Sequence, residues 1–377
     1  MIRSRHVLLL LGLFVLAAVE SPNAAEDDAA PSDAVSADEA GKFLPLPLFI
    51  TEPAIGEGLG AALIYFHGED RKEGLKVSTA REVSRTTRRS KPPPTATGIF
   101  GAYTNNDTAA LGIGHSNSFM QDRYRLLAAT ADARINSSFF IADSAFDFTL
   151  DGNLLYANLK RRLGDSSGFV GFTSSYADAG VNFKTDLGAF KDVPLLDFDF
   201  IDVGFALSLI YDTRDNTLAP ARGYIVDLTN WHHDEAIGGD FNYRNLTFKA
   251  NSYYELDSKH VLGLRFDVAA SDGNPPFFAE TYVKLRGIPA LRYQGETAGA
   301  AEIEIRRRIY DRWSASLFGG VGSVDASTKE NETKDDIRTV GFGVRYLAVK
   351  EQDAWIGIDI ARGPEDIAGY IQMGNAW

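Results

Sequence analysis

Residue types that could carry out catalysis are few in this chain, and their spacing does not bring them together. Cysteine is absent, which excludes thiolate metal sites and cysteine nucleophiles. No His-x-x-x-His, HExxH or Gly-x-Ser-x-Gly pattern occurs. The histidines beyond residue 6 are His67, His115, His232, His233 and His260. His232 and His233 would point to opposite faces of a strand, so the sequence predicts no metal site, no cofactor and no enzyme.

Eight basic residues gather in one segment, residues 68–94, ahead of three consecutive prolines. Guanidinium and ammonium groups bind phosphate. This segment would therefore bind the phosphates of lipopolysaccharide if it lies outside the cell; the alternative is a flexible, solvated loop. The whole chain has 38 Lys+Arg against 51 Asp+Glu, which argues against nucleic acid as a partner. The basic residues are Arg71, Lys72, Lys76, Arg81, Arg85, Arg88, Arg89 and Lys91.

The N-terminus has the pattern of a secretory signal peptide. Two arginines precede an apolar run from Val7 to Val19, and small residues follow it. That run is too short for a membrane-spanning helix, which needs about 20 residues, and no later apolar run approaches this length. Residues 1–25 are therefore predicted to be removed, with cleavage after Ala24 or Ala25.

The segment behind the signal peptide differs sharply from the rest of the chain. Removal of the signal peptide takes away two arginines and one glutamate, which leaves 36 basic and 50 acidic residues. Residues 26–42 are acidic and rich in Ala and Ser, so they are predicted to form a disordered linker. From residue 43 onward glycines and aromatic residues become frequent, and residues 43–377 are predicted to be the folded domain.

Alternation of apolar with polar or small residues dominates the folded domain. This period of two is typical of strands with one apolar face. The clearest examples are residues 201–212, 262–268, 301–306, 340–346 and 356–361. Both a soluble β-sandwich and a membrane barrel would produce it.

Export, strand length and connection length favour the barrel. Several segments reach ten residues, as barrel strands of about 9–11 residues require, and sandwich strands are usually shorter. Tight turns alternate with long loops, as in outer-membrane barrels. The turns are residues 105–107, 257–259 and 352–353, and the loops are residues 68–94, 271–299 and 323–336.

The strand count follows from these segments. Fifteen candidate strands lie between Leu59 and Trp377, and the ambiguous segment Phe139–Phe148 is taken as the sixteenth because bacterial barrels usually have an even number. Strands can satisfy all their backbone groups in lipid only by closing on themselves. The predicted fold is therefore all-β: a closed antiparallel transmembrane β-barrel of 16 strands.

Four ordered segments resemble the barrel of the BamA/TamA outer-membrane assembly superfamily, also called the bacterial surface antigen family. They are Pro53–Gly60, a Gly-rich entry into a strand; Tyr211–Asn216 with Pro220 and Gly223; Leu285–Ile288, with Ile in place of an aromatic residue; and the terminal Trp377. The resemblance implies a bacterial outer-membrane location and contact with outer-membrane lipids. It does not determine the oligomeric state.

The resemblance implies that the loop carrying Arg286 and Gly287 folds back into the lumen, where the arginine pairs with acids on the wall. The candidate partners are Glu302, Glu304 and Asp359. The family often has an aspartate in a Phe-x-Asp-x-Gly strand motif, and this chain has Gly320 at that position. A solvated loop arginine is the alternative.

The other two segments imply structure rather than chemistry. The turn motif consists of Asp212, Arg214, Asp215, Asn216, Pro220 and Gly223, which are suited to a tight strand connection. In the family, a terminal aromatic such as Trp377 is the signal read by the barrel-assembly machinery during insertion. Here Asn375 interrupts the apolar pattern before it.

Three functional hypotheses remain. The first is a barrel-only member of the family, with a role in outer-membrane biogenesis or surface structure; residues 26–42 are too few for the periplasmic POTRA domains of the assembly proteins. The second is a channel for small solutes, favoured by polar and small residues in the lumen phase of the pattern: Gly204, Ser208, Arg265 and Asp267. The third is a lipid-modifying barrel enzyme, which would need a Ser, a His and an acid or amide aligned on one outer face.

Overall fold

The computed structural model describes most of the predicted folded domain. The described residues are 42–52, 54–67, 95–141, 144–183, 197–216, 219–325, 334–349, 354–374 and 377. The predicted signal peptide, linker residues 26–41, the basic segment 68–94 and the turn at residues 352–353 lie outside them.

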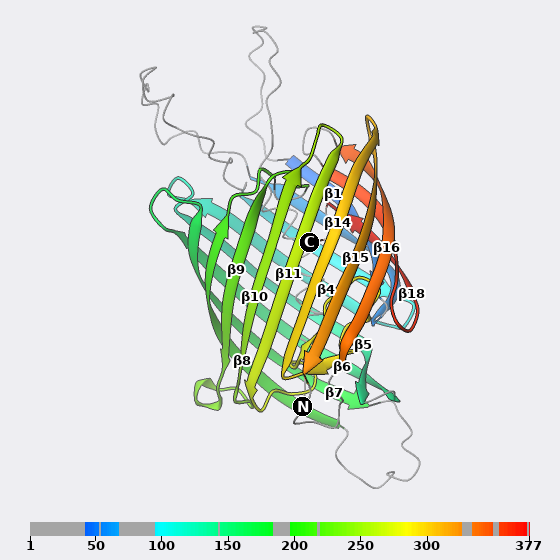
Figure 1. The fold of residues 1–377 in the computed structure, drawn as a ribbon. Coiled ribbons are helices and arrows are strands. Elements are labelled where there is room, and N and C mark those ends of the chain that lie inside the picture. The colour runs from blue at the N-terminus through cyan, green and yellow to red at the C-terminus, as the bar shows by residue number, and fades with distance from the viewer. Residues whose placement is uncertain are drawn as a thin grey trace.

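Sixteen antiparallel strands, each paired with the next strand of the set in chain order, form a single barrel (Figure 1). In its first half the strands are β1 Lys42–Glu52, β2 Gly56–Phe66, β3 Ala96–Thr104, β4 Ala109–Phe119, β5 Tyr124–Ile141, β6 Ser144–Arg162, β7 Gly168–Phe183 and β8 Asp197–Asp212. In its second half they are β9 Gly223–His233, β10 Tyr243–Glu255, β11 His260–Gly273, β14 Thr297–Tyr310, β15 Trp313–Asp325, β16 Lys334–Val349, β17 Ala354–Arg362 and β18 Ile367–Met373. The predicted all-β barrel and its strand count are confirmed.

The barrel is nearly closed between its first and last strands. Strands β1 and β18 lie side by side, and the backbone N–H of Ile371 donates to the Thr51 hydroxyl at 2.9 Å. Among the described residues no backbone ladder joins β1 to β18, whereas every other neighbouring pair has one. Pro45 and Pro47 of β1 lack an N–H, and proline is tolerated in a sheet at such an edge.

The sixteenth strand is not the one expected from the sequence. Phe139–Phe148 is not a strand of its own; it contains the end of β5 and the start of β6, on either side of residues 142–143. The missing strand is β1, Lys42–Glu52, which pairs with β2 from Lys42↔Phe66 to Glu52↔Gly56. This strand was not predicted from the sequence because it contains two prolines, and proline disfavours a strand interior.

The extra strand at the start determines the end of the barrel at which His67 and Thr95, the residues that flank the basic segment, lie. We call the end of the barrel where β1 begins the turn end; the short connections 120–123, 163–167, 256–259 and 311–312 lie there. The connections 105–108 and 363–366 are equally short and lie at the opposite end, so the predicted turn at residues 105–107 is not on the same side as the one at residues 257–259. The opposite end, with residues 234–242 and 274–296, is the loop end. The backbone N–H of His67 donates to the Thr95 carbonyl at 2.9 Å and brings both sides of segment 68–94 together at the turn end. Short turns are typical of the periplasmic end of such barrels. Because short connections occur at both ends here, contact of the basic segment with lipopolysaccharide stays a prediction.

The two faces of the strands follow the alternation read from the sequence. In β16 the outward side chains Val340, Phe342 and Val344 are 62%, 51% and 42% exposed. Their inward neighbours Thr339 and Arg345 are 6% and 2% exposed. An apolar outer face with a partly polar interior is the arrangement of a barrel in lipid. Within the described ranges, no helix is long and apolar enough to cross a membrane.

Buried side chains of the wall and of the connection between β11 and β14 occupy part of the lumen. On the side of β5 to β8, inward residues such as Phe148, Leu150, Val181 and Phe200 form part of a buried apolar cluster. On the side of β14 to β17 the inward residues include charged groups such as Glu302. The connection between β11 and β14, residues 274–296, contributes buried residues to both sides.

Candidate functional site in the barrel lumen

The connection 274–296, which we call the lumen loop, packs against the inner wall of the barrel. It carries a short hairpin of its own, β12 (Thr281–Tyr282) paired with β13 (Gln294–Gly295). Its side chains Phe278, Val283 and Leu291 are each 1% exposed. A loop buried to this degree is part of the barrel core.

Arg286 of the lumen loop contacts three carboxylates of the wall. Its Nη2 lies 2.6 Å from Glu302 Oε1. Its Nη1 lies 2.9 Å from Glu304 Oε2 and 2.6 Å from Asp359 Oδ2. The guanidinium also stacks on the Phe318 ring, with its Cζ 3.4 Å from the ring centroid. The structure thus brings together the arginine and all three of the acids considered from the sequence.

Glu302 takes the place of the carboxylate that the sequence lacks at Gly320. The two residues face each other in the register of β14 with β15. At Gly320 a Cβ would lie 2.7 Å from Leu285 Cδ2 of the lumen loop. The missing side chain therefore makes room for the loop, and the acid is supplied from the neighbouring strand.

Two further arginines complete the cluster, and the sequence analysis missed both. Arg345 Nη2 lies 3.0 Å from Asp359 Oδ2, and Arg306 Nε lies 3.6 Å from Glu304 Oε1. Three cations thus face three carboxylates in a buried region. Burial lowers the pKa of the Arg286 guanidinium, but the neighbouring carboxylates outweigh burial and raise the pKa above its usual range. The alternation in β16 could have identified Arg345, because it directs this side chain into the lumen.

Gly287 allows the loop to turn directly behind Arg286. Its φ is +92°, a left-handed value that favours glycine. A Cβ there would lie 3.1 Å from the backbone N of Gly363 and 3.2 Å from the Ala361 Cβ. Its own N–H donates to the Tyr370 hydroxyl at 2.8 Å. Both the conformation and the close approach to β17 therefore require glycine at this position.

Two adjacent phenylalanines form a second anchor of the lumen loop. The ring of Phe277 lies 4.2 Å from that of Phe139 and 5.1 Å from that of Phe148. The ring of Phe278 lies 6.0 Å from that of Phe200. The sequence analysis missed this anchor, although two consecutive aromatic residues in a Gly- and Pro-rich loop are unusual for a solvated segment.

We expect Lys284 to make docking of the lumen loop depend on pH. Burial lowers the pKa of Lys284 to about 7, helped by Lys249 and Arg265 and opposed by Asp267. The ammonium also lies 4.9 Å from the Tyr282 ring centroid. Because this pKa is below the ordinary lysine value, the undocked loop binds the proton more tightly. Docking should therefore strengthen as pH rises from about 7 to about 10 and be weakest below 7.

We expect ion flow through the protein in a planar bilayer to increase at least severalfold between about pH 8.5 and about pH 5.5. Lys284→Met should abolish that difference, because the titrating group is gone while its apolar stem is retained. A pH response of unchanged size in this variant would contradict the assignment to Lys284.

The turn motif fixes the connection between β8 and β9 at the turn end. Asp212 pairs with Arg214, whose Nη2 lies 2.8 Å from its Oδ2. Asp215 Oδ1 accepts from the backbone N–H groups of residues 221 and 222 at 3.0 and 3.1 Å. Asn216 Oδ1 accepts from the N–H of residue 219 at 3.1 Å. The Pro220 carbonyl accepts from Arg306, and Gly223 has a φ of +93°. Each motif residue thus has a local structural contact.

Trp377 lies inside the barrel and does not end a strand, since β18 ends at Met373. Its indole N–H donates to Glu302, and its carbonyl accepts from the Tyr253 hydroxyl at 2.6 Å. A Cβ on Gly263 would lie 2.7 Å from the indole ring. Trp377 and Arg286 thus donate to the same oxygen, Glu302 Oε1, so the tryptophan is a further neutral donor to the carboxylate cluster. Within the part of the chain that the structure describes, no group of three or more His, Cys, Asp or Glu is placed to hold a metal ion.

A family model, the Omp85 superfamily domain, matches residues 74–286, which is more than half of the chain. The chain belongs to the Omp85 superfamily. Its barrel is accordingly an outer-membrane barrel, and the resemblance to the BamA/TamA barrel is confirmed.

Solved structures show the same fold as this Omp85 chain at low sequence identity. The BamA barrel from Haemophilus ducreyi, in a structure lacking POTRA domains 1–3, has a TM-score of 0.61 and 11% identity over 89% of this chain and 70% of that one. CdiB from Escherichia coli has a TM-score of 0.60 and 9% identity over 90% of this chain. CdiB from Acinetobacter baumannii has a TM-score of 0.58 and 8% identity over 89%. The chain spans 63% and 60% of the two CdiB chains. No curated protein matches.

Proposed function

We propose that this Omp85 barrel works in outer-membrane biogenesis and that its lumen is closed at rest by the lumen loop. The observation that supports the closed state is the seating of Arg286 among three wall carboxylates, with Phe277 and Phe278 packed on the opposite wall. A barrel of this kind passes or inserts a client only when the loop moves. We also propose that a cleaved signal peptide, residues 1–25, exports the chain, and that the barrel-assembly machinery inserts it, with Trp377 as part of the signal.

The resting closure can be tested by planar-bilayer conductance. The wild-type protein at about pH 8.5 is expected to pass no steady current, since paired charges and packed aromatic rings occupy the lumen. Arg286→Ala is expected to pass current, because the loop loses its charged anchor. A large, stable wild-type current would sink the proposal and favour the alternative, a constitutive channel for small solutes.

The role in biogenesis needs a separate test in cells. A strain lacking the protein should show an altered amount of outer-membrane proteins in its membrane fraction, and the wild-type gene should restore it. Restoration by Arg286→Ala as complete as by wild type would separate loop closure from the biogenesis role. An unchanged membrane fraction in the deletion strain would argue against that role. We assign no enzymatic activity; hydrolysis of any lipid in a panel by purified protein would overturn this assignment.

A further inference from the structure

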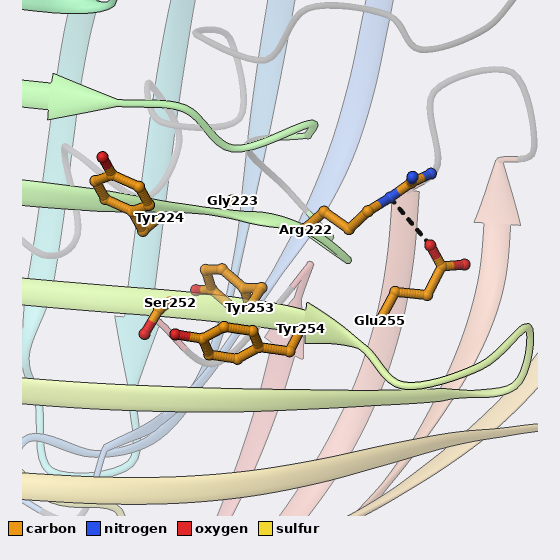
Figure 2. Close-up of a pocket in the computed structure, with 7 residues that line it drawn as sticks. All are labelled: Arg222, Gly223, Tyr224, Ser252, Tyr253, Tyr254 and Glu255. Carbon is orange, nitrogen blue, oxygen red and sulfur yellow. Dashed lines mark ion pairs between the residues drawn. The ribbon is translucent and has the colours of Figure 1, made fainter.

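A pocket lined by tyrosines and by one ion pair lies on the outer face of the barrel at the turn end. It has a volume of about 350 Å3 and lies between the end of β10 and the start of β9. Figure 2 shows that both strands contribute side chains to it. Its lining residues are Arg222, Gly223, Tyr224, Ser252, Tyr253, Tyr254 and Glu255. Apart from Gly223, which it shares with the turn motif, its lining residues belong to neither the lumen loop nor that motif.

The pocket lies at the level of the barrel where lipid headgroups meet the protein. Tyr224 and Tyr254 point outward and are 45% and 52% exposed. Tyr253, the residue before Tyr254 in β10, points into the lumen and is 3% exposed. Tyr224 stacks on Tyr211 of β8, with ring centroids 5.8 Å apart. Further along the same end, Trp313 belongs to an outward aromatic pair as well. Such aromatic girdles mark the boundary between the hydrocarbon core and the headgroups.

Opposite charges face the pocket side by side. Arg222 Nε lies 3.0 Å from Glu255 Oε2, and the arginine side chain is 66% exposed (Figure 2). The pair is thus in reach of a ligand and presents a guanidinium and a carboxylate next to each other. An anionic ligand would meet Glu255 and a cationic ligand would meet Arg222, so the pair suits a ligand that carries both charges.

We propose that this pocket binds the headgroup of a zwitterionic aminophospholipid in the leaflet at the turn end. Arg222 takes the phosphate in charge-assisted hydrogen bonds, and Glu255 accepts from the primary ammonium. The Tyr254 ring flanks the ammonium as a cation–π partner. The acyl chains extend over the lipid-facing side chains below, among which Leu228 and Leu246 are 38% and 46% exposed.

Native mass spectrometry of the full chain, titrated with phosphatidylethanolamine, phosphatidylglycerol and phosphatidylcholine of one acyl composition, tests the proposal. Wild type is expected to bind phosphatidylethanolamine about tenfold more tightly than either other lipid, the effect of one charge-assisted hydrogen bond. Phosphatidylcholine is disfavoured because its ammonium has no N–H to donate. Equal binding of the three lipids would overturn the proposal.

Variants that remove one charge from the pocket test which residues bind the lipid headgroup. Glu255→Gln should remove the preference for phosphatidylethanolamine over phosphatidylglycerol, since the repulsion of an anionic lipid disappears. Arg222→Gln should weaken the binding of phosphatidylethanolamine and of phosphatidylglycerol about tenfold each. The control is Arg338→Gln, which breaks a more exposed pair with Asp336 (2.6 Å) at the loop end and should leave all three affinities unchanged. An unaltered lipid preference in Glu255→Gln, or an equal loss in the control, would refute the assigned site.

Discussion

Replacing Arg286 with alanine is expected to lower the free energy of unfolding by about 3–5 kcal/mol, the usual cost of removing one partner of a buried ion pair. The variant leaves three carboxylates facing two arginines in a buried region. Asp359 keeps Arg345 at 3.0 Å, and Glu304 keeps Arg306 at 3.6 Å. Glu302 has no such replacement cation among the described ion pairs, and its charge becomes the main source of the loss.

Denaturant unfolding of the protein in detergent, followed by the loss of β-sheet circular dichroism, measures this effect. The matched control is Arg134→Ala, which breaks an ion pair of 2.6 Å with Asp151 whose side chains are 61% and 43% exposed. Its cost should stay within about 1 kcal/mol. Adding Glu302→Gln to Arg286→Ala should restore part of the lost stability. A double variant less stable than Arg286→Ala would show that the unpaired charge is not the cause.

The period of two in the sequence predicted the strands and their apolar face, because the physical origin of this alternation is local. Successive side chains of a strand point to opposite faces, and the lipid requires an apolar residue on one of them. Residues 340–346 illustrate this, with outward Val340, Phe342 and Val344 and an inward Arg345. Strands whose inner face is apolar as well, such as β6 with Phe148 and Leu150, give a weaker signal. The Phe139–Phe148 segment was misread for this reason.

The first strand could not be predicted from its own residues. Pro45 and Pro47 argue against a strand in any local reading, and only the pairing of β1 with β2 at the edge of the sheet makes them acceptable. This one strand decides which end of the barrel each connection occupies. The end at which His67 and Thr95 lie therefore could not be predicted from strands counted from Leu59 onward.

Some of the lumen contacts were predicted from the sequence, and others depend on the tertiary structure. The order of the motifs singled out Arg286. The three acids that it contacts were its candidate partners, because the alternation along their strands directs their side chains into the lumen. That Glu302 would stand across from Gly320 depends on the register of β14 with β15, which alternation does not determine. The aromatic anchor depends on where the loop enters the lumen, and that is a tertiary property.

Replacing Phe278 with alanine is expected to cost about 3–5 kcal/mol, the range for removing a buried aromatic side chain. Phe278 is 1% exposed, and its ring contacts those of Phe200, Phe241 and Phe277. The same denaturant unfolding measures the loss. A matched control is Phe172→Ala, because Phe172 is 49% exposed on the outer face and leaves no cavity behind in detergent.

The double variant with Arg286→Ala tests whether the two anchors hold the lumen loop independently. Phe278 packs on side chains of β8 and the β9–β10 connection, whereas Arg286 pairs with β14 and β17, and the two share no described partner. Changes in unfolding free energy at sites without shared partners add within about 0.5 kcal/mol. The loss of stability in the double variant should therefore equal the sum of the losses in the single variants. A combined loss no larger than that of Arg286→Ala alone would mean that Arg286→Ala already releases the loop. In that case the carboxylate cluster, and not the aromatic anchor, would control closure of the lumen.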